Sequence, residues 1–517
     1  MKLFSDLPEL AYDIIKYFKN DFSTLHSCIL VNRLWCRLAI PLLWENPFSI
    51  PTKNYNFIGI YLHNLNDDLK AQLNKYKIDD KLFPSNTLFN YPIFLKYLYT
   101  QKIISSIEEW SKDVGLKYSA KHEFNRLIHL SLFKIFIENK VNIHTFDISY
   151  YYHYNTYIDD ILELLLQYPD FFYNIRILKL ELLNSFSYTR NLILQMINLY
   201  QNLKQITLTY FSFPLYKSLL ISRDFNQSSN TLNTIILSGL NFKGVTNLDK
   251  LFEKLNVLES VHIIYCNLVT DFIQQIINLT KPFKLKSLFL CNNNELQIVE
   301  SLQLLFQKCG DYLENFGLEV GYSSFISEEQ QLLELIIKYC KNIKFLDLTE
   351  IGNTQIIHSL LNLTENVKQN LNHLSISSVF NDDYPNTIEY SSIMLQNLGQ
   401  LLPLKLEYLN LIFDIKYKND FEIFLKNSQN TFIKKLLINN RVSKDNYIHD
   451  FILSHIKKYI MKKKRIKYLA FINYSNIDLF SLKNEVKEFG LYNIKIQKYC
   501  DLVIDSKLKF VETLKDF

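Results

Sequence analysis

The chain has 517 residues, of which 48% are hydrophobic and 21% are charged. This balance is typical of a globular protein and excludes an intrinsically disordered one. The net charge of +5 is too small to predict nucleic-acid binding by itself. The seven cysteines are scattered and form no Cys-x-x-Cys pair, so we expect neither a zinc ribbon nor a thioredoxin-like motif.

Two further features concern the compartment. Asp6, Pro8, Glu9 and Asp13 interrupt the apolar core that a signal peptide needs. No run of about 18 uncharged apolar residues is present, so we expect no membrane span. Scattered thiols in a long chain favour a reduced, intracellular protein, cytoplasmic or nuclear.

Three short helices are predicted in residues 3–48. Ser5 or Asp6 is placed to cap the first helix, and Asp21 or Ser23 the second. A third helix is expected to begin near Val31. So small a unit has a marginal core, and apolar side chains that it leaves exposed would mark a partner surface.

The same segment carries an ordered set of short motifs: "LPEL", "II", "VNRLW" and "PLLW". Together they resemble an F-box, with its opening Leu-Pro at Leu7–Pro8, apolar pair at Ile14–Ile15 and Val-x-x-x-Trp at Val31–Trp35. Asn32 stands where that family often has cysteine. The resemblance implies contact with a Skp-type adaptor, and through it a cullin, by nine residues: Leu7, Pro8, Leu10, Ile14, Ile15, Leu25, Cys28, Val31 and Trp35. The alternative is a plain helical cap on the repeats that follow.

Residues 49–140 contain helical patterns and no repeat. In "YLYTQKIISSIEEWSKDV", Ile103, Ile107 and Trp110 recur at helical spacing. We interpret this range as a helical connector docked on the following domain and not as a flexible tether. Trp44 and Phe48 are expected to close the N-terminal unit and join it to this connector.

A six-residue phrase with apolar residues at positions 1, 4 and 6 recurs in residues 141–517. "LKSLFL", "IKFLDL" and "LEYLNL" are clear copies. The thirteen copies begin on average about 29 residues apart, within the range of leucine-rich repeats. They start at residues 143, 175, 203, 232, 258, 285, 313, 343, 371, 406, 433, 466 and 491.

Each phrase predicts a short strand with one buried face, and amphipathic helices lie between the phrases. Leu333, Ile336, Ile337 and Cys340 fall on one helical face, with Ser327 as an expected N-cap. The pattern resembles leucine-rich repeat proteins, although the ninth position often lacks the usual Asn or Cys. We therefore predict an α/β fold: an F-box (1–48), a helical connector (49–140) and a right-handed leucine-rich repeat solenoid (141–517) of about 13 degenerate repeats, with a parallel concave sheet and convex helices.

The concave wall is the predicted site for a protein substrate. Positions 3, 5 and 7 of each phrase are expected to point to solvent there, and their mixture of polar and isolated aromatic side chains suits a protein or peptide better than DNA. Ten residues are assigned to this surface: Gln205, Thr207, Ser260, His262, Phe289, Phe345, Asp347, His373, Tyr408 and Asn410.

Two other stretches are candidate interaction sites. "SYYYHYNTY" (149–157) offers tyrosines for recognition, but we favour a rim loop over the first repeat. The basic cluster at 457–467 fits a nuclear localisation signal or an acidic partner, but we favour a solvated helix.

The sequence offers little for catalysis. It contains no P-loop, no H-E-x-x-H and no G-x-S-x-G, and the carboxylate pairs Asp159–Asp160 and Asp382–Asp383 lie in polar stretches. We therefore expect no enzyme activity, cofactor, metal, nucleic acid or membrane. The predicted function is a non-catalytic receptor that links a protein target to a Skp–cullin ubiquitin ligase. The alternative is a leucine-rich repeat scaffold with a helical cap and no ligase role.

Overall fold

The computed structural model describes most of the chain. The ranges outside the description are 1–7, 20, 51, 53, 64, 66, 77–85, 114–117, 151–154, 183–186, 211–229, 291–297, 320–325, 379–385, 443–445, 462–464, 475–476 and 505–517. The chain divides into two compact units: unit 1 is Met1–Ile235 with Lys254–Val257, and unit 2 is Ile236–Glu253 with Leu258–Phe517.

Unit 1 begins with helices and continues with alternating strands and helices. The helices before the first strand are α1 (Pro8–Lys16), α2 (Phe22–Ile29), α3 (Arg33–Leu43), α4 (Phe57–Leu62) and α5 (Asp67–Asn74). The elements from the first strand onward are β1 (Tyr97–Tyr99), α6 (Thr100–Asp113), α7 (Tyr118–Glu138), β2 (Thr145–Tyr150), α8 (Asn155–Leu166), β3 (Ile177–Leu182), α9 (Ser187–Ile197) and β4 (Gln205–Tyr210). β5 (Thr234–Ser238) spans the residue at which the division between the units falls.

The three N-terminal helices form a small unit with its own core. Asp21 caps α2, accepting from the Thr24 amide at 3.0 Å, as the sequence predicted. Asn32 caps α3 in the same way, accepting from the Trp35 amide at 2.9 Å. The core of the unit consists of Ile15, Leu25, Cys28, Ala39 and Leu42. Ser5 and Asp6, the expected caps of α1, lie outside the described residues.

The end of α3 is fixed to the strand that opens the sheet. The buried carboxylate of Glu45 pairs with Lys19 at 2.8 Å and with Lys96 at 2.5 Å. The carbonyl of Glu45 accepts from the Lys96 and Tyr97 amides at 3.0 and 3.2 Å. Polar and backbone bonds therefore connect the three-helix unit directly to β1.

Aromatic contacts support this joint. The Trp44 ring meets Phe57, Tyr61 and Tyr91 at centroid distances of 6.4, 5.2 and 4.2 Å. Phe48 lies parallel to Tyr61 at 5.9 Å. The two residues thus join the N-terminal unit to the connector, whereas the core of the three-helix unit forms without them.

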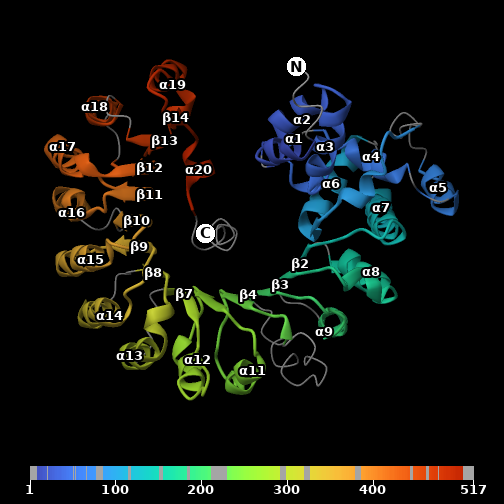
Figure 1. Cartoon of the computed structure of the whole chain (residues 1–517), viewed down its shortest axis with the longest axis horizontal. Helices are drawn as coiled ribbons and strands as arrows, with labels where there is room; N and C mark the ends of the chain where they lie inside the picture. The colour runs from blue at the N-terminus through green and yellow to red at the C-terminus, as the bar shows by residue number, and fades with distance from the viewer. Residues whose placement is uncertain are drawn as a thin grey trace. The chain divides into compact units, whose positions relative to one another are not determined.

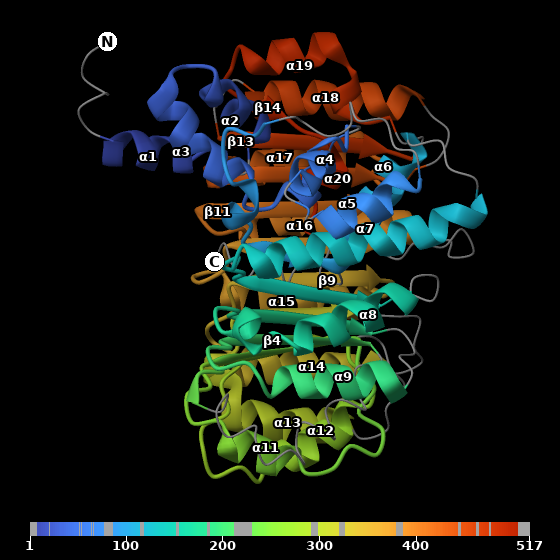
Figure 2. The same ribbon diagram turned by 90° about the vertical axis from the view of Figure 1, so that its right-hand side faces the viewer.

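Strands β1 to β4 pair in parallel and in chain order. β1 lies within the range assigned to the connector, so the sheet begins before residue 141. Its helix follows at once, and Thr100, the first residue of α6, accepts from the Ser149 amide at 2.9 Å. On the helical side of unit 1, α7, α8 and α9 follow one another as neighbouring layers (Figure 2).

Unit 2 repeats the strand–helix pattern with greater regularity. Strands β6 to β14 pair in parallel and in chain order. Within this unit the helices lie outside the strands (Figure 1). The strands are β6 (Ser260–Ile264), β7 (Leu285–Leu290), β8 (Asn315–Glu319), β9 (Phe345–Ile351), β10 (His373–Ser378), β11 (Lys405–Phe413), β12 (Phe432–Asn440), β13 (Ile466–Asn473) and β14 (Lys495–Ile496). The helices are α11 (Leu248–Lys254), α12 (Val269–Ile276), α13 (Ile298–Cys309), α14 (Ile326–Tyr339), α15 (Thr354–Val367), α16 (Thr387–Leu401), α17 (Lys418–Asn427), α18 (Asn446–Tyr459), α19 (Lys483–Gly490) and α20 (Tyr499–Leu502).

The repeat phrase explains the layering. Positions 4 and 6, such as Leu346 and Leu348 in β9, are fully buried. Each of the thirteen phrases overlaps one of the strands β2 to β14, so the predicted α/β leucine-rich repeat solenoid is confirmed. Ser327 lies inside the first turn of α14 and not before it, because this helix begins at Ile326.

Candidate functional site

The three-helix unit exposes part of the predicted adaptor surface. Val31 is 53% exposed and Leu10 is 47% exposed. Pro8 is also exposed, and Ile14 and Trp35 are half-buried. Large apolar side chains left in water on a folded unit are the usual mark of a partner surface. Leu7 lies outside the described residues.

Other predicted adaptor residues hold the unit together instead. Ile15, Leu25 and Cys28 are buried in its core, and Trp35 packs against that core from the side. Buried side chains cannot touch another chain while the unit is folded. Any direct contact is therefore limited to the exposed members of the set.

Two further apolar residues of this unit are exposed and were not predicted from the sequence. Leu30 is 76% exposed in the turn between α2 and α3, and Tyr17 is exposed just after α1. The signal for Leu30 was present, because it directly precedes Val31 between two predicted helices. These residues enlarge the apolar surface beyond the motif itself.

The residues predicted for the concave wall lie where the phrase places them but are mostly buried. Six of the ten belong to unit 2 and are buried: His262, Phe289, Phe345, Asp347, Tyr408 and Asn410. Ser260 and His373 in unit 2 are half-buried. The expectation that these positions point to solvent is therefore wrong for most of the wall. We call the face of the unit 2 sheet that carries these eight side chains the inner wall.

In unit 1, Gln205 and Thr207 stand on β4. Gln205 is half-buried and Thr207 is buried. These two residues belong to unit 1, whereas the inner wall belongs to unit 2. We therefore do not count them as part of the inner wall.

Aromatic rings run across the inner wall from strand to strand. Phe345, His373 and Tyr408 are paired in register on β9, β10 and β11. The Phe345 and His373 rings are stacked at a centroid distance of 5.8 Å, and the His373 and Tyr408 rings at 5.9 Å. Parallel pairing thus turns a residue type repeated at position 3 into a continuous stack.

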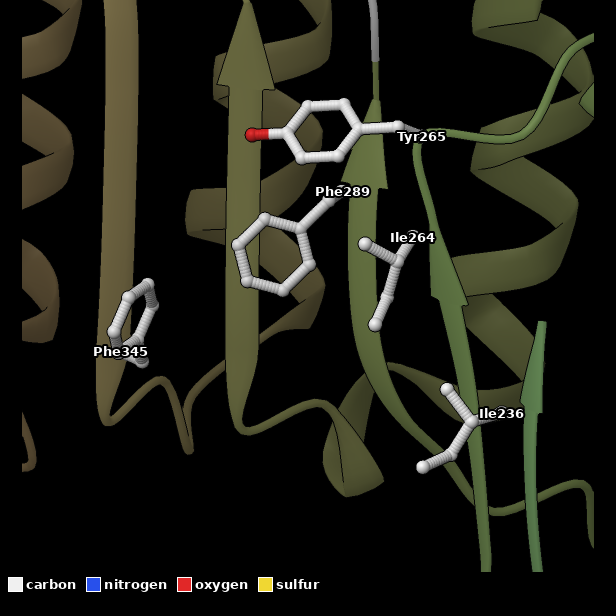
Figure 3. Close-up of a cluster of buried hydrophobic side chains, with 5 residues drawn as sticks. All are labelled: Ile236, Ile264, Tyr265, Phe289 and Phe345. Atoms are coloured by element: carbon white, nitrogen blue, oxygen red, sulfur yellow. The ribbon is translucent and has the colours of Figure 1, made fainter. Parts of the chain in front are cut away.

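A glycine makes room for another ring. Gly317 on β8 is paired with Phe289 on β7, and a Cβ at Gly317 would clash with Cδ1 of Phe289. The Phe289 ring therefore lies over the glycine and toward Phe345, at 5.9 Å between centroids. Figure 3 shows these two rings with Ile236, Ile264 and Tyr265, the other members of this buried cluster.

Polar groups on the inner wall are paired with one another. Ser287 Oγ lies 2.7 Å from His262 Nδ1 and accepts from Asn315 Nδ2 at 2.9 Å. Asn410 Nδ2 donates to Ser375 Oγ at 3.3 Å. Burial lowers the pKa of both His262 and His373 to about 4, so both imidazoles are neutral at pH 7.

The inner wall of unit 2 is covered in part by the chain itself. After β14 the chain turns back along the inner side of the sheet as α20 (Figure 1). Tyr499 OH donates to Asn410 Oδ1 at 2.8 Å, and the Ile504 amide donates to Tyr408 OH at 3.1 Å. We call residues 497–504 the tail segment. It was not predicted from the sequence, because the phrase at residue 491 indicates only one more repeat.

The tail segment also makes apolar contacts. Tyr499 and Leu502 form a buried cluster with Tyr408, Leu437 and Ala470 of the wall, and Val503 packs against it. Ile504 packs against this cluster and against the one that contains Phe289 and Phe345. The segment therefore bridges two apolar parts of the same wall.

The tyrosine-rich stretch and the basic cluster have structural roles where they are described. Most of the tyrosine-rich stretch lies outside the described residues, but Tyr157 is buried in α8 and its hydroxyl donates to the His122 carbonyl at 3.1 Å. In the basic cluster, Lys457 pairs with Glu485 at 2.6 Å and Lys458 with Glu422 at 3.1 Å. These pairs favour the solvated-helix interpretation for this part of the cluster.

Nothing in the described ranges forms a cluster suited to metal or carboxylate chemistry. No group of three or more His, Cys, Asp or Glu side chains is placed there to hold a metal. Asp159 accepts from Thr189 at 2.7 Å, and Asp160 forms an ion pair with Arg126 at 2.5 Å. Asp382 and Asp383 fall outside the description. Among the helices described, none has the length and apolar character needed to cross a membrane.

Comparison with known proteins gives a likeness in fold alone. No family model and no curated protein matches the sequence. Among solved structures, the chain is similar to the leucine-rich repeat-containing protein LegL7 from Legionella pneumophila, with 13% identity and a TM-score of 0.36. That match covers 67% of this chain and 97% of the other.

Proposed function

We propose that the chain is a non-catalytic substrate-recognition subunit that links a protein target on its repeats to a Skp–cullin ubiquitin ligase. The observation that carries the proposal is the apolar surface of the three-helix unit, centred on Leu30 and Val31. The unit has a core of its own, so this surface is not needed to hold it together. The motif order in the sequence supports an adaptor as its partner.

The joint at Glu45 supports the same role. A receptor that presents a target to a second enzyme works best when the adaptor-binding end and the repeats are rigidly connected. The ion pair of Glu45 with Lys96 and the two backbone bonds that Glu45 accepts from Lys96 and Tyr97 supply such a connection to β1. A flexible joint at this point would weaken the proposal.

The test is co-purification of the full chain with a Skp-type adaptor. Val31→Asp places a charge on the exposed surface, and we expect it to abolish adaptor binding without unfolding the unit. Leu88→Asp is the matched control, because Leu88 is 89% exposed in unit 1 but lies outside the three-helix unit. Equal adaptor binding by both variants and the unaltered chain would contradict the proposal.

The second candidate is a leucine-rich repeat scaffold with a helical cap. The repeat fold itself favours an interaction role, with or without a ligase. The scaffold hypothesis predicts that the chain does not bind a Skp-type adaptor. The same co-purification experiment therefore distinguishes the scaffold from the ligase receptor.

A further inference from the structure

We propose that the inner wall of unit 2 is a binding site for a peptide with a tyrosine followed by aliphatic residues. In the structure this site is held by the tail segment of the same chain, and a segment of like chemistry from a protein target binds by displacing it. The inference deepens the proposed function, because it rests on the repeats being the surface for a protein target.

The site is built for a specific polar contact. Tyr408 and Asn410 are buried, and each uses a side-chain oxygen to accept a bond from the tail segment, from the Ile504 amide and the Tyr499 hydroxyl. Removing the tail segment takes both donors away from these acceptors, and a ligand that brings new donors restores the bonds. A ligand that carries a hydroxyl and a backbone N–H at this spacing can therefore replace both bonds of the tail segment.

The apolar contacts define the rest of the ligand. The Tyr499 ring and Leu502 fill the space over Leu437 and Ala470, where the small alanine leaves room. Ile504 reaches the cluster of Phe289 and Phe345. A matching ligand carries an aromatic residue, an aliphatic residue three positions later and another two positions after that.

The way in which the tail segment is held makes it exchangeable. α20 is only four residues long, and it is fixed at its start by the Tyr499 amide, which donates to Asp478 Oδ2 at 2.8 Å. Cys500 and Asp501, on its outer side, are exposed. The segment thus packs some side chains against the wall and exposes others, as a bound peptide does, whereas β14 before it is part of the sheet.

Because the tail segment is covalently attached next to its site, a free target segment would compete with it poorly for the inner wall. A segment attached directly to the neighbouring strand has an effective concentration on the order of millimolar or more at its site. A target segment must therefore be present in high local concentration, or the tail segment must be weakened first. The tail segment acts as an internal competitor.

The experiment uses the full chain and a fluorescent synthetic peptide. The peptide has the sequence of residues 497–504 with serine in place of Cys500, and binding is measured by fluorescence anisotropy. The test variant is the double substitution Leu502→Asp with Ile504→Asp, which expels the tail segment from the apolar wall. The matched control is Leu491→Asp, because Leu491 is 82% exposed and lies just before β14.

We expect the double variant to bind the peptide about tenfold or more tightly than the unaltered chain, and Leu491→Asp to behave like the unaltered chain. A peptide with phenylalanine in place of Tyr499 should bind the double variant about fivefold more weakly, as expected for one lost hydrogen bond. A folded double variant that binds the peptide no better than the unaltered chain would overturn the proposal.

A second variant protects the test against misfolding. If circular dichroism shows that the double variant has lost its fold, the single substitution Tyr499→Phe in the full chain is tested instead, since it removes the hydroxyl that donates to Asn410 and keeps the ring. Tighter peptide binding by Tyr499→Phe supports the proposal, and unchanged binding overturns it. Adaptor co-purification of the same proteins separates the two proposals, because the tail segment and the three-helix unit lie in different units.

Discussion

The three-helix unit and the inner wall of unit 2 both gather apolar side chains, but the chain treats them differently. At the three-helix unit, Leu30 and Val31 stay exposed over a core that is complete without them. At the inner wall, Phe345 and Tyr408 are buried, and the chain's own tail segment packs over that surface. Apolar residues on a predicted surface therefore indicate a contact, and only the structure shows whether the contact is already made.

The largest expected effect comes from truncating one side chain in each region and comparing the changes in the free energy of unfolding. Phe345→Ala should lower the free energy of unfolding by about 3–5 kcal/mol, because it removes a buried ring from two neighbouring packing contacts. Val31→Ala should change it by no more than about 0.5 kcal/mol. Urea unfolding followed by circular dichroism measures both, and equal losses would erase the distinction between the regions.

Acid should weaken the inner wall before the three-helix unit. Burial lowers the pKa of His262 from 6.5 to about 4, so the unfolded chain takes up its proton first. The stability that neutral His262 contributes is complete above about pH 6.5 and is lost as the pH falls toward 4, by about 2–3 kcal/mol. The histidine of the three-helix unit, His26 in α2, is exposed.

The measurement is the thermal midpoint of the full chain between pH 7 and pH 4. His262→Gln, which retains a hydrogen-bonding side chain beside Ser287, should flatten the decline in that window. If the thermal midpoint of His262→Gln falls with pH as steeply as that of the unaltered chain, His262 is not the source of the decline.

A smaller effect is expected where the three-helix unit meets β1. Glu45→Ala leaves Lys19 and Lys96 without their carboxylate and should lower the free energy of unfolding by about 1–3 kcal/mol. Hydrogen exchange of the Lys96 and Tyr97 amides should become faster, since both bond to residue 45. Lys112→Ala, at an exposed ion pair with Glu109, serves as the control and should have little effect.

The smallest effect concerns the cap that aligns the exposed surface. Asn32→Ala removes the acceptor of the Trp35 amide and should cost about 1 kcal/mol. Asn32→Ser keeps a capping oxygen and should restore most of the loss. The thermal midpoint measures both, and an unchanged midpoint for Asn32→Ala would mean that the cap is dispensable.

The repeat architecture could be predicted from sequence because its signal is local. Each phrase carries its own alternation, and all thirteen phrases fall on strands. β1 was missed because its phrase, "LKYLYT", ends in Thr100 and not in an apolar residue. Thr100 is buried nevertheless, because its hydroxyl bonds to the backbone of Ser149.

The cover on the inner wall could not be predicted in this way. The bond from Tyr499 to Asn410 joins residues 89 positions apart, and that from Ile504 to Tyr408 spans 96. Periodicity identifies which face of a strand is buried by helices. It does not predict that a non-repeating segment, such as the tail segment, packs over the other face. Asn32 is a further example: it departs from the motif it was compared with, and its role as a cap is visible only in the local geometry.

The buried carboxylate at the end of α3 has a geometrical consequence. Since Glu45 bonds through its side chain to Lys96 and through its backbone to the Lys96 and Tyr97 amides, turning the helices about this point would break three bonds at once. A protein bound to Leu30 and Val31 would therefore keep a constant orientation relative to β1.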